Sequence, residues 1–260
     1  MGGLRPAAVL AFLAVATAAS AGERIVTVES RPGVTVDFAV TDAAGPTAAV
    51  TLLLGGGEGN LSLWRGPLAP GRNFLIRTRT LFAAQGMMAL SVDVPSDLRD
   101  TGLQGKRDRD EHRADIAAVV KWARGQTKAP VWLVGNSTGT ISAAYLAAAL
   151  PVDGAVLTSS FTEPSKLNRA TVLDAPLDRI RVPVLIVHNR DDECPYTPIE
   201  GTERIKSRLR SSPKVEIKFF QGGDAPRSGP CDALAGHGFL GLERPVVSAI
   251  ADWIKAQSRR

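Results

Sequence analysis

The sequence predicts a single α/β domain with a mostly parallel sheet and helices on both faces. Stretches typical of buried strands alternate with stretches of helical spacing, which is the order of parallel β-α-β units. The 260 residues suffice for one sizeable core, and a composition that is 44% hydrophobic and 22% charged is typical of a globular protein. No repeat, low-complexity segment or linker divides the chain, so we expect one domain.

The N-terminal residues have the features of a secretory signal peptide. Arg5 supplies a short positive region, residues 7–18 form an apolar run, and Ala-Ser-Ala at 19–21 fits a cleavage site. The run is shorter than the roughly 20 apolar residues that a membrane span needs. We therefore expect a signal peptide over 1–21 and a domain over 22–260 in a secreted or periplasmic protein. An uncleaved anchor, or the Ala-rich helix of a cytosolic protein, is the alternative.

Strand and helix signals then follow in a regular order. Alternating residues at 25–28 and 34–40, with a Pro-Gly turn between them, predict an N-terminal antiparallel hairpin. Further strands are expected at 48–54, 87–94, 131–134, 155–157, 182–187 and 215–220. Helices are expected at 74–84, 110–123, 140–145, 202–209 and 246–254, and residues 96–110 are expected to form a polar loop.

The net charge of +5 is modest, and its basic residues are scattered. Arg107 and Arg109, for example, alternate with Asp108 and Asp110, which is typical of a solvated face. We therefore expect no nucleic-acid partner.

The most informative motif is Gly-Asn-Ser-Thr-Gly at residues 135–139, which lies between a predicted strand and a predicted helix. A serine on such a sharp turn is held out of the sheet, where a substrate carbonyl can reach it. The flanking glycines allow close backbone approach. Ser137 is therefore a candidate nucleophile, and the alternative is an ordinary turn with an exposed serine.

An acid and a base follow Ser137 in the chain. Asp191 and Asp192 come just after the strand 182–187, at the edge of the sheet where active sites of open α/β sheets collect. His237 comes before the last predicted helix. A serine nucleophile needs a neutral imidazole to take its proton, and the imidazole needs a carboxylate to orient it. The chain has only three histidines, at 112, 188 and 237, so the choice of base is narrow.

The chain resembles the α/β-hydrolase family over residues 25–254. The resemblance rests on Gly135–Gly139, on the aspartate after the strand 182–187 and on Gly236-His237-Gly238 before the last helix. Many relatives have the pattern H-G-x-x-D at the acid turn. Residues 188–192 align with it and select Asp192, with Asn189 in place of the usual glycine and Asp191 as the alternative.

The resemblance also assigns roles to the histidines. It implies that His237 is the base and that His188 is a structural residue at the end of a strand. His112, at the start of a charged helix, is most simply a solvated surface histidine.

The run Gly55-Gly56-Gly57 follows the strand 48–54. In relatives this loop supplies one N–H of the oxyanion hole, and the residue after the nucleophile supplies the other. The resemblance therefore implies Gly56 or Gly57, together with Thr138. Leu54 stands where the histidine of the HGG form would be, which leaves the choice of glycine open. The alternatives are a flexible surface loop or, on a poor motif match, a phosphate-binding loop.

Two cysteines lie beyond the signal segment, and an even count in an exported protein suggests a disulfide. Cys194 comes two residues after Asp192, and Cys231 comes six before His237, so a bond would tie the acid loop to the base loop. Such a bond contributes about 4 kcal/mol in the chain-entropy model. Two free thiols are the alternative.

These observations lead to one functional hypothesis. We expect an exported serine hydrolase without metal or organic cofactor, whose small-molecule ester or acyl substrate is cleaved through an acyl-enzyme. A peptidase or thioesterase, or a catalytically idle binding protein, is the alternative.

About two dozen residues separate the strands at 155–157 and 182–187, where relatives insert a cap, so we expect no large cap and an open site. Leu61, Leu63, Trp64 and Leu103 are candidates for its walls, with ordinary packing as their alternative. The substrate and the oligomeric state stay open.

Overall fold

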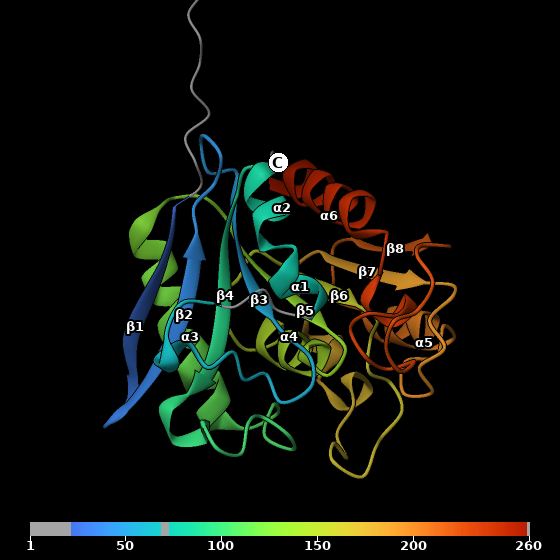
Figure 1. Cartoon of the computed structure of the whole chain (residues 1–260), viewed down its shortest axis with the longest axis horizontal. Helices are drawn as coiled ribbons and strands as arrows, with labels where there is room; N and C mark the ends of the chain where they lie inside the picture. The colour runs from blue at the N-terminus through green and yellow to red at the C-terminus, as the bar shows by residue number, and fades with distance from the viewer. Residues whose placement is uncertain (1–21, 69–72, 259–260) are drawn as a thin grey trace, which may run out of the picture.

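The computed structural model describes residues 22–68 and 73–258, so the predicted signal peptide lies outside the described residues. An eight-stranded sheet forms the centre of a single domain (Figure 1). Its strands stand in the order β1-β2-β4-β3-β5-β6-β7-β8. The strands are β1 (Glu23–Arg31), β2 (Val34–Thr41), β3 (Ala49–Leu54), β4 (Met87–Pro95), β5 (Val131–Asn136), β6 (Gly154–Thr158), β7 (Val184–Asn189) and β8 (Val215–Phe220).

The sheet is parallel from β4 to β8, and β1 and β2 form the predicted antiparallel hairpin at its edge. The inner strands are buried along their whole length and mostly apolar because helices cover both of their faces. In the register, Leu52 of β3 lies beside Leu90 of β4 and Leu133 of β5. The predicted strands are confirmed, with ends that differ by a few residues.

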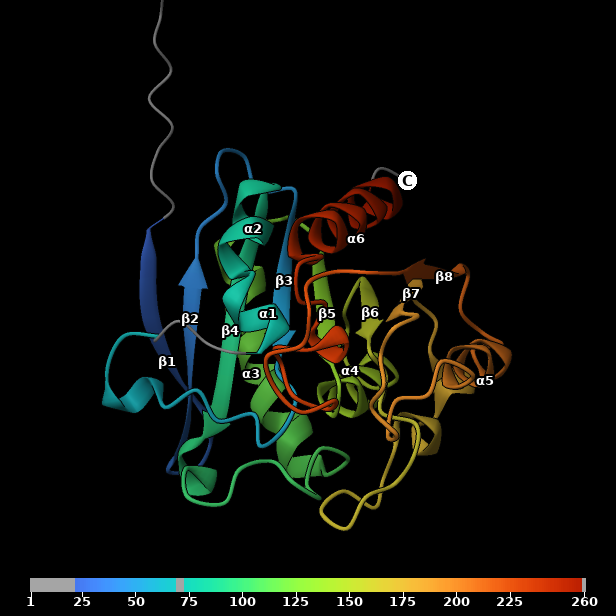
Figure 2. The same cartoon turned by 45° about the vertical axis from the view of Figure 1, so that its right-hand side comes forward.

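Helices cover the two faces of the sheet in two layers (Figure 2). The helices are α1 (Phe74–Arg77), α2 (Arg79–Ala84), α3 (Asp110–Gln126), α4 (Gly139–Ala147), α5 (Gly201–Arg208) and α6 (Glu243–Ser258). The cores match this division: Phe82 and Ile250, from α2 and α6, belong to one apolar cluster, and Ile116 and Ile205, from α3 and α5, belong to the other.

The single helix predicted over 74–84 is broken at Thr78, which separates α1 from α2. The Thr78 hydroxyl donates to the carbonyl oxygen of Phe74, 2.7 Å away. Threonine hydroxyls that bond back to the preceding turn bend helices in this way.

Two residues that were predicted to be solvated are buried. Arg107 is 3% exposed and His112 is 4% exposed, and both contact Ser142 of α4. The predictions were wrong because alternating charges do not reveal which side chains point toward the sheet. In the folded chain, Arg107 and His112 lie just before and at the start of α3 and point inward.

Within residues 22–68 and 73–258, no cap domain covers the carboxyl edge of the sheet. The segment between β6 and β7 contains only the short helices η3 (Val172–Asp174) and η4 (Leu177–Arg179), as its length predicts. In the described part of the chain, no helix has both the length and the apolar character that crossing a membrane requires.

Candidate active site

Ser137 lies on a sharp turn between β5 and α4. Its φ angle is 55°, which is the left-handed region that residues other than glycine rarely adopt and which costs about 1–2 kcal/mol. A Cβ at Gly135 would lie 2.5 Å from the carbonyl oxygen of Gly139, and one at Gly139 would clash with that of Leu54. Both positions of the motif therefore require glycine. Ser137 itself is partly exposed.

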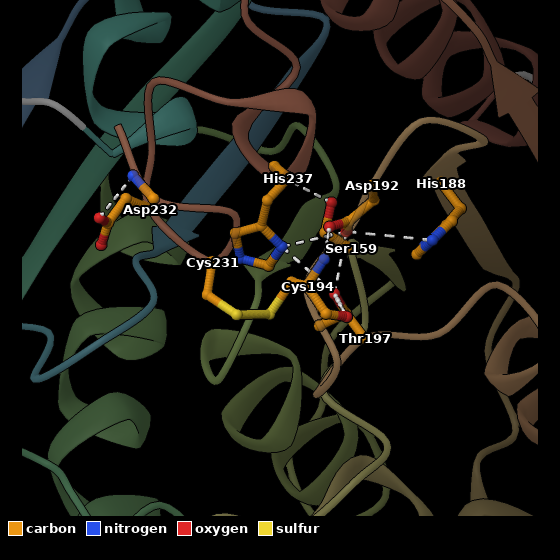
Figure 3. Close-up of a disulfide and its surroundings, with 9 residues drawn as sticks. Ser159, His188, Asp192, Cys194, Thr197, Cys231, Asp232 and His237 are labelled. Carbon is orange, nitrogen blue, oxygen red and sulfur yellow. Dashed lines mark hydrogen bonds and ion pairs between the residues drawn. A yellow bond between two sulfur atoms is a disulfide. The ribbon is translucent and has the colours of Figure 1, made fainter. Parts of the chain in front are cut away.

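Asp192 and His237 form a buried pair after β7 and before α6 (Figure 3). Asp192 Oδ2 lies 3.0 Å from His237 Nδ1, and the carboxylate is fully buried. Two further donors hold it: the backbone N–H of Cys194 at 3.0 Å and the Thr197 hydroxyl at 2.9 Å. Because an ionised carboxylate only accepts hydrogen bonds, the Nδ1–H of His237 donates to it. In the neutral ring, Nε2 is then the atom that can take a proton.

The neighbouring carboxylate of Asp191 has a different partner. Its Oδ2 accepts from the backbone N–H of Gly222 at 2.7 Å. The two candidate acids are thus distinguished by geometry, since Asp192 is the one that contacts His237.

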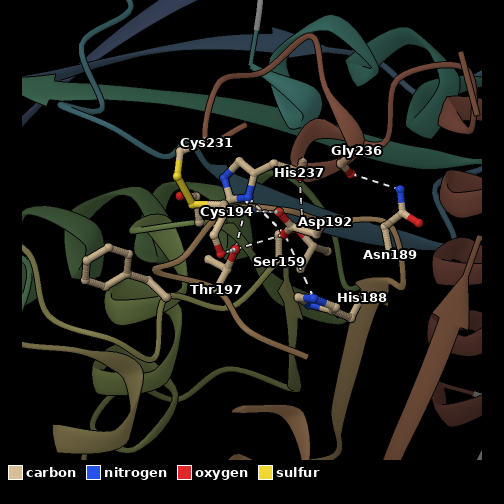
Figure 4. Close-up of polar contacts among 12 residues, drawn as sticks. Ser159, His188, Asn189, Asp192, Cys194, Thr197, Cys231, Gly236 and His237 are labelled. Carbon is tan, nitrogen blue, oxygen red and sulfur yellow. Dashed lines mark hydrogen bonds and ion pairs between the residues drawn. A yellow bond between two sulfur atoms is a disulfide. The ribbon is translucent and has the colours of Figure 1, made fainter. Parts of the chain in front are cut away.

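Asn189 connects the turn that carries Asp192 to the segment that carries His237 (Figure 4). Its Nδ2 donates to the carbonyl oxygen of Gly236, and its Oδ1 accepts from the N–H of Asp191, both at 3.1 Å. A glycine could make neither contact. The Asn189 side chain thus holds the turn that carries Asp192 against the segment that carries His237.

Cys194 and Cys231 are joined in a disulfide, as the sequence predicts (Figure 3). The bond links the acid loop to the segment that leads into His237. Because the N–H of Cys194 also donates to Asp192, the disulfide anchors one of the groups that hold the acid.

Thr158, Ser159 and Thr197 are parts of this site that no motif in the sequence indicates. The carbonyl oxygen of Thr158 accepts from the N–H of Ser137 at 3.0 Å. The Ser159 hydroxyl donates to the carbonyl oxygen of His237 at 2.8 Å (Figure 4). Consecutive residues at the end of β6 thus hold the backbones of both Ser137 and His237. The only sequence feature of Thr158 and Ser159 that points to the site is their position at the carboxyl end of a buried strand. That position does not predict which backbone groups they contact.

The glycine loop after β3 lies directly against the serine turn. A Cβ at Gly56 would lie 2.8 Å from Ser137 Cβ and 3.0 Å from the carbonyl oxygen of Asn136, so only glycine fits there. The Thr138 hydroxyl donates to the carbonyl oxygen of Gly57 at 3.1 Å. Among the described residues, the N–H groups of Gly56, Gly57 and Thr138 have no hydrogen-bond acceptor. These three amides are therefore free to serve as donors to a ligand.

His188 is a buried neighbour of the acid. Its Nε2 lies 3.9 Å from Asp192 Oδ2, which is too far for a hydrogen bond, and neither ring nitrogen has a hydrogen-bond partner among the described residues. Burial lowers the pKa of His188, so the ring is neutral at pH 7 beside the Asp192–His237 pair.

Leu63 and Leu103, two of the candidate wall residues, are buried in the protein, while Trp64 is 40% exposed. A cavity of about 330 Å³ opens on the outer side of the acid turn, beside Asp191 and Glu193. Ser137 and His237 do not line this cavity, so it is not the place where a bound carbonyl would meet the serine.

No protein-family model matches the sequence, and a search of curated proteins finds no match. Solved structures are similar in fold. A dienelactone hydrolase from Anabaena variabilis is 16% identical with a TM-score of 0.64, over 92% of this chain and 97% of that one. An esterase from Pyrococcus furiosus is 15% identical with a TM-score of 0.66, over 92% of both chains. A serine hydrolase without lid from Xanthomonas campestris is 14% identical with a TM-score of 0.60, over 92% and 94%. The chain therefore has the α/β-hydrolase fold that its sequence resembles.

Proposed function

We propose that this chain is a serine hydrolase that cleaves carboxylic esters, with Ser137 as nucleophile, His237 as base and Asp192 as the carboxylate that orients the base. One observation carries the proposal: the buried Asp192–His237 contact lies at the same edge of the sheet as a serine in a strained turn. Strained backbone conformations cluster at functional sites, and the turn that carries a nucleophilic serine is one example.

The proposed reaction has two halves. His237 Nε2 takes the hydroxyl proton of Ser137 while Oγ attacks the ester carbonyl carbon, and the carbonyl oxygen becomes an oxyanion. The N–H groups of Gly56 and Thr138 stabilise that charge. When the intermediate collapses, the alcohol leaves with the proton from His237. A water molecule, deprotonated by His237, then attacks the acyl-enzyme, and the acid product and free Ser137 are released.

The substrate proposed is a small ester. The partly exposed serine and the short η3–η4 segment support an open site that does not enclose a large ligand. Several solved structures with this fold are named as esterases or as a dienelactone hydrolase, which also supports ester chemistry.

We also propose that the protein is exported after cleavage behind Ala21. The disulfide supports this location, because such bonds persist in oxidising compartments. N-terminal sequencing of the protein from its native host tests the proposal: Gly22 should be the first residue, and an intact Met1 on cytosolic protein would overturn it.

A fluorophosphonate probe, which labels activated serines, tests the hydrolase itself. The wild-type protein should be labelled and should hydrolyse p-nitrophenyl acetate. Ser137→Ala should lose both properties, whereas Ser207→Ala, at an exposed serine of α5, should keep both. A folded wild-type protein that is neither labelled nor active on p-nitrophenyl esters of several chain lengths would be a binding protein on a hydrolase scaffold.

A further inference from the structure

A guanidinium group is buried directly behind the glycine loop. Arg107 Nη2 donates to the carbonyl oxygens of Gly55 and Gly57, each at 3.0 Å, and Nη1 donates to the Ser142 hydroxyl at 3.0 Å. Among the described residues, no carboxylate pairs with Arg107. A full positive charge is thus buried against neutral acceptors, and two of those belong to the loop that contacts Ser137.

This burial is costly for stability. A buried charge without an ionic partner loses its hydration, and hydrogen bonds to carbonyl groups recover only part of that loss. Burial lowers the pKa of Arg107 to about 10, so the group still carries its charge at neutral pH. Arg107 Nε has no hydrogen-bond partner in the described structure, which adds to the cost. Packing alone does not require a charged side chain here.

The geometry of the peptide unit gives these contacts a consequence. In a trans peptide the C=O of one residue and the N–H of the next point in opposite directions, and the described residues contain no cis peptide. Because Arg107 holds the carbonyl oxygen of Gly55, the N–H of Gly56 points away from Arg107. Gly56 is also the loop residue that approaches Ser137.

We propose that Arg107 is a positioning residue for the oxyanion hole: it fixes the carbonyl groups of Gly55 and Gly57 so that the N–H of Gly56 faces the oxygen of the tetrahedral intermediate. Its charge also polarises that peptide unit and makes the N–H a stronger donor. This inference rests on the proposed function, and it selects Gly56 over Gly57 as the donor from the loop.

A second set of contacts holds Arg107 itself. His112 Nε2 lies 2.9 Å from the Ser142 hydroxyl, and burial, with a smaller effect of the nearby Arg107, lowers the pKa of His112 to about 3. The ring is therefore neutral at pH 7, and its Nε2 shares a hydrogen bond with the Ser142 hydroxyl, whose oxygen also accepts from Arg107. Helices α3 and α4 are thus connected to the glycine loop through one chain of hydrogen bonds.

The loop is connected to the serine turn as well. The carbonyl oxygen of Gly57 accepts from both Arg107 and the Thr138 hydroxyl. Thr138 carries the second proposed N–H donor, so the two donors belong to one hydrogen-bonded unit in which Arg107 is the only charged member.

The test compares Arg107→Met with Arg107→Lys, and with Arg109→Met at an exposed arginine two residues away. Hydrolysis of p-nitrophenyl acetate and inhibition by a trifluoromethyl ketone, which adds to the serine and forms an oxyanion, are measured for each. We expect Arg107→Met to lower kcat about 10²-fold, the scale of a 1 Å misplacement, with little change in KM. Affinity for the trifluoromethyl ketone should fall by the same factor as kcat/KM. Arg107→Lys should recover part of the loss, and Arg109→Met should behave as wild type.

Wild-type kcat and inhibitor affinity in a folded Arg107→Met protein would overturn the inference. An equal loss of affinity for the trifluoromethyl ketone and for the matching methyl ketone would also overturn it. The oxyanion donors should stabilise only the trifluoromethyl ketone adduct, whose oxygen is negatively charged. If Arg107→Met does not fold, the inference is tested by comparing the Tm and the inhibitor affinity of Arg107→Lys with those of Ser142→Ala. Ser142→Ala keeps both carbonyl contacts, so it should lower Tm but cost less inhibitor affinity than Arg107→Lys, and the reverse order would contradict the proposal.

The outcome for Arg107 is separate from that of the proposed function. If the wild-type protein is not labelled by a fluorophosphonate, the hydrolase proposal fails whatever the variants do. If the wild type is labelled and Arg107→Met is labelled at the same rate, the hydrolase proposal stands and the Arg107 inference fails.

Discussion

Asn189 Nδ2 donates to the carbonyl oxygen of Gly236 at 3.1 Å, and this contact ties the turn that carries Asp192 to the segment that carries His237. The disulfide from Cys194 to Cys231 makes a second, covalent tie between the same two segments. Without such ties, the acid and the base would be held together mainly by their own contact, because they lie on different loops.

Replacing Asn189 with glycine should loosen the two segments. The variant loses two hydrogen bonds, each of which contributes about 1 kcal/mol to stability. We expect a lower free energy of unfolding in urea titration and a reduced kcat. Arg190→Gly, at the exposed neighbouring position, is the control for added backbone freedom. Equal effects of the two changes would show that the Asn189 side chain does not matter.

Asp192→Asn should lower kcat/KM for p-nitrophenyl acetate by about 10⁴, the cost of losing the carboxylate that orients a catalytic histidine. Asp191→Asn is the matched control, since its carboxylate contacts the N–H of Gly222 and not His237. It should affect stability more than turnover. A larger loss of activity in Asp191→Asn would mean that the acid is the other residue of the pair.

Removing the disulfide by a Cys194→Ser and Cys231→Ser double substitution should lower the free energy of unfolding by about 2–5 kcal/mol. Activity should be the more sensitive property, because small displacements of the acid and the base cost large factors in rate. Thiol titration of the denatured, unreduced wild-type protein provides the check on the bond itself. Two free thiols would remove this explanation of how the two loops are kept together.

Stability should fall in mild acid because of His112. Its pKa is about 3 in the folded protein and near 6.5 when unfolded, so below pH 6.5 the unfolded chain binds a proton that the folded protein does not. The stability is fully present above pH 6.5 and is lost as the pH falls toward 3, by up to about 1.4 kcal/mol per pH unit. Urea unfolding between pH 6.5 and 4.5 should show a shallower slope for His112→Gln than for the wild type. An unchanged slope would mean that His112 is protonated in the folded state.

The strands were the most predictable elements. Those of the inner sheet are mostly apolar, since both faces are buried, and this signal is local to each stretch of sequence. The break at Thr78 was missed because a side chain that bonds back to its own helix leaves no mark on the apolar spacing.

The fold class, the serine turn, the cysteine pair and a short choice of histidines were predictable from the sequence alone, because each follows from residue types at close spacing or from a small count. The resemblance favoured Asp192 with Asp191 as the alternative, but the contact with His237 and the burial of Arg107 and His112 depend on the folded chain. Adjacent carboxylates are chemically identical, and the direction of each is set by partners far along the chain, such as Gly222 for Asp191 and His237 for Asp192. The burial of Arg107 likewise depends on Gly55 and Ser142, which folding brings to it from two other segments.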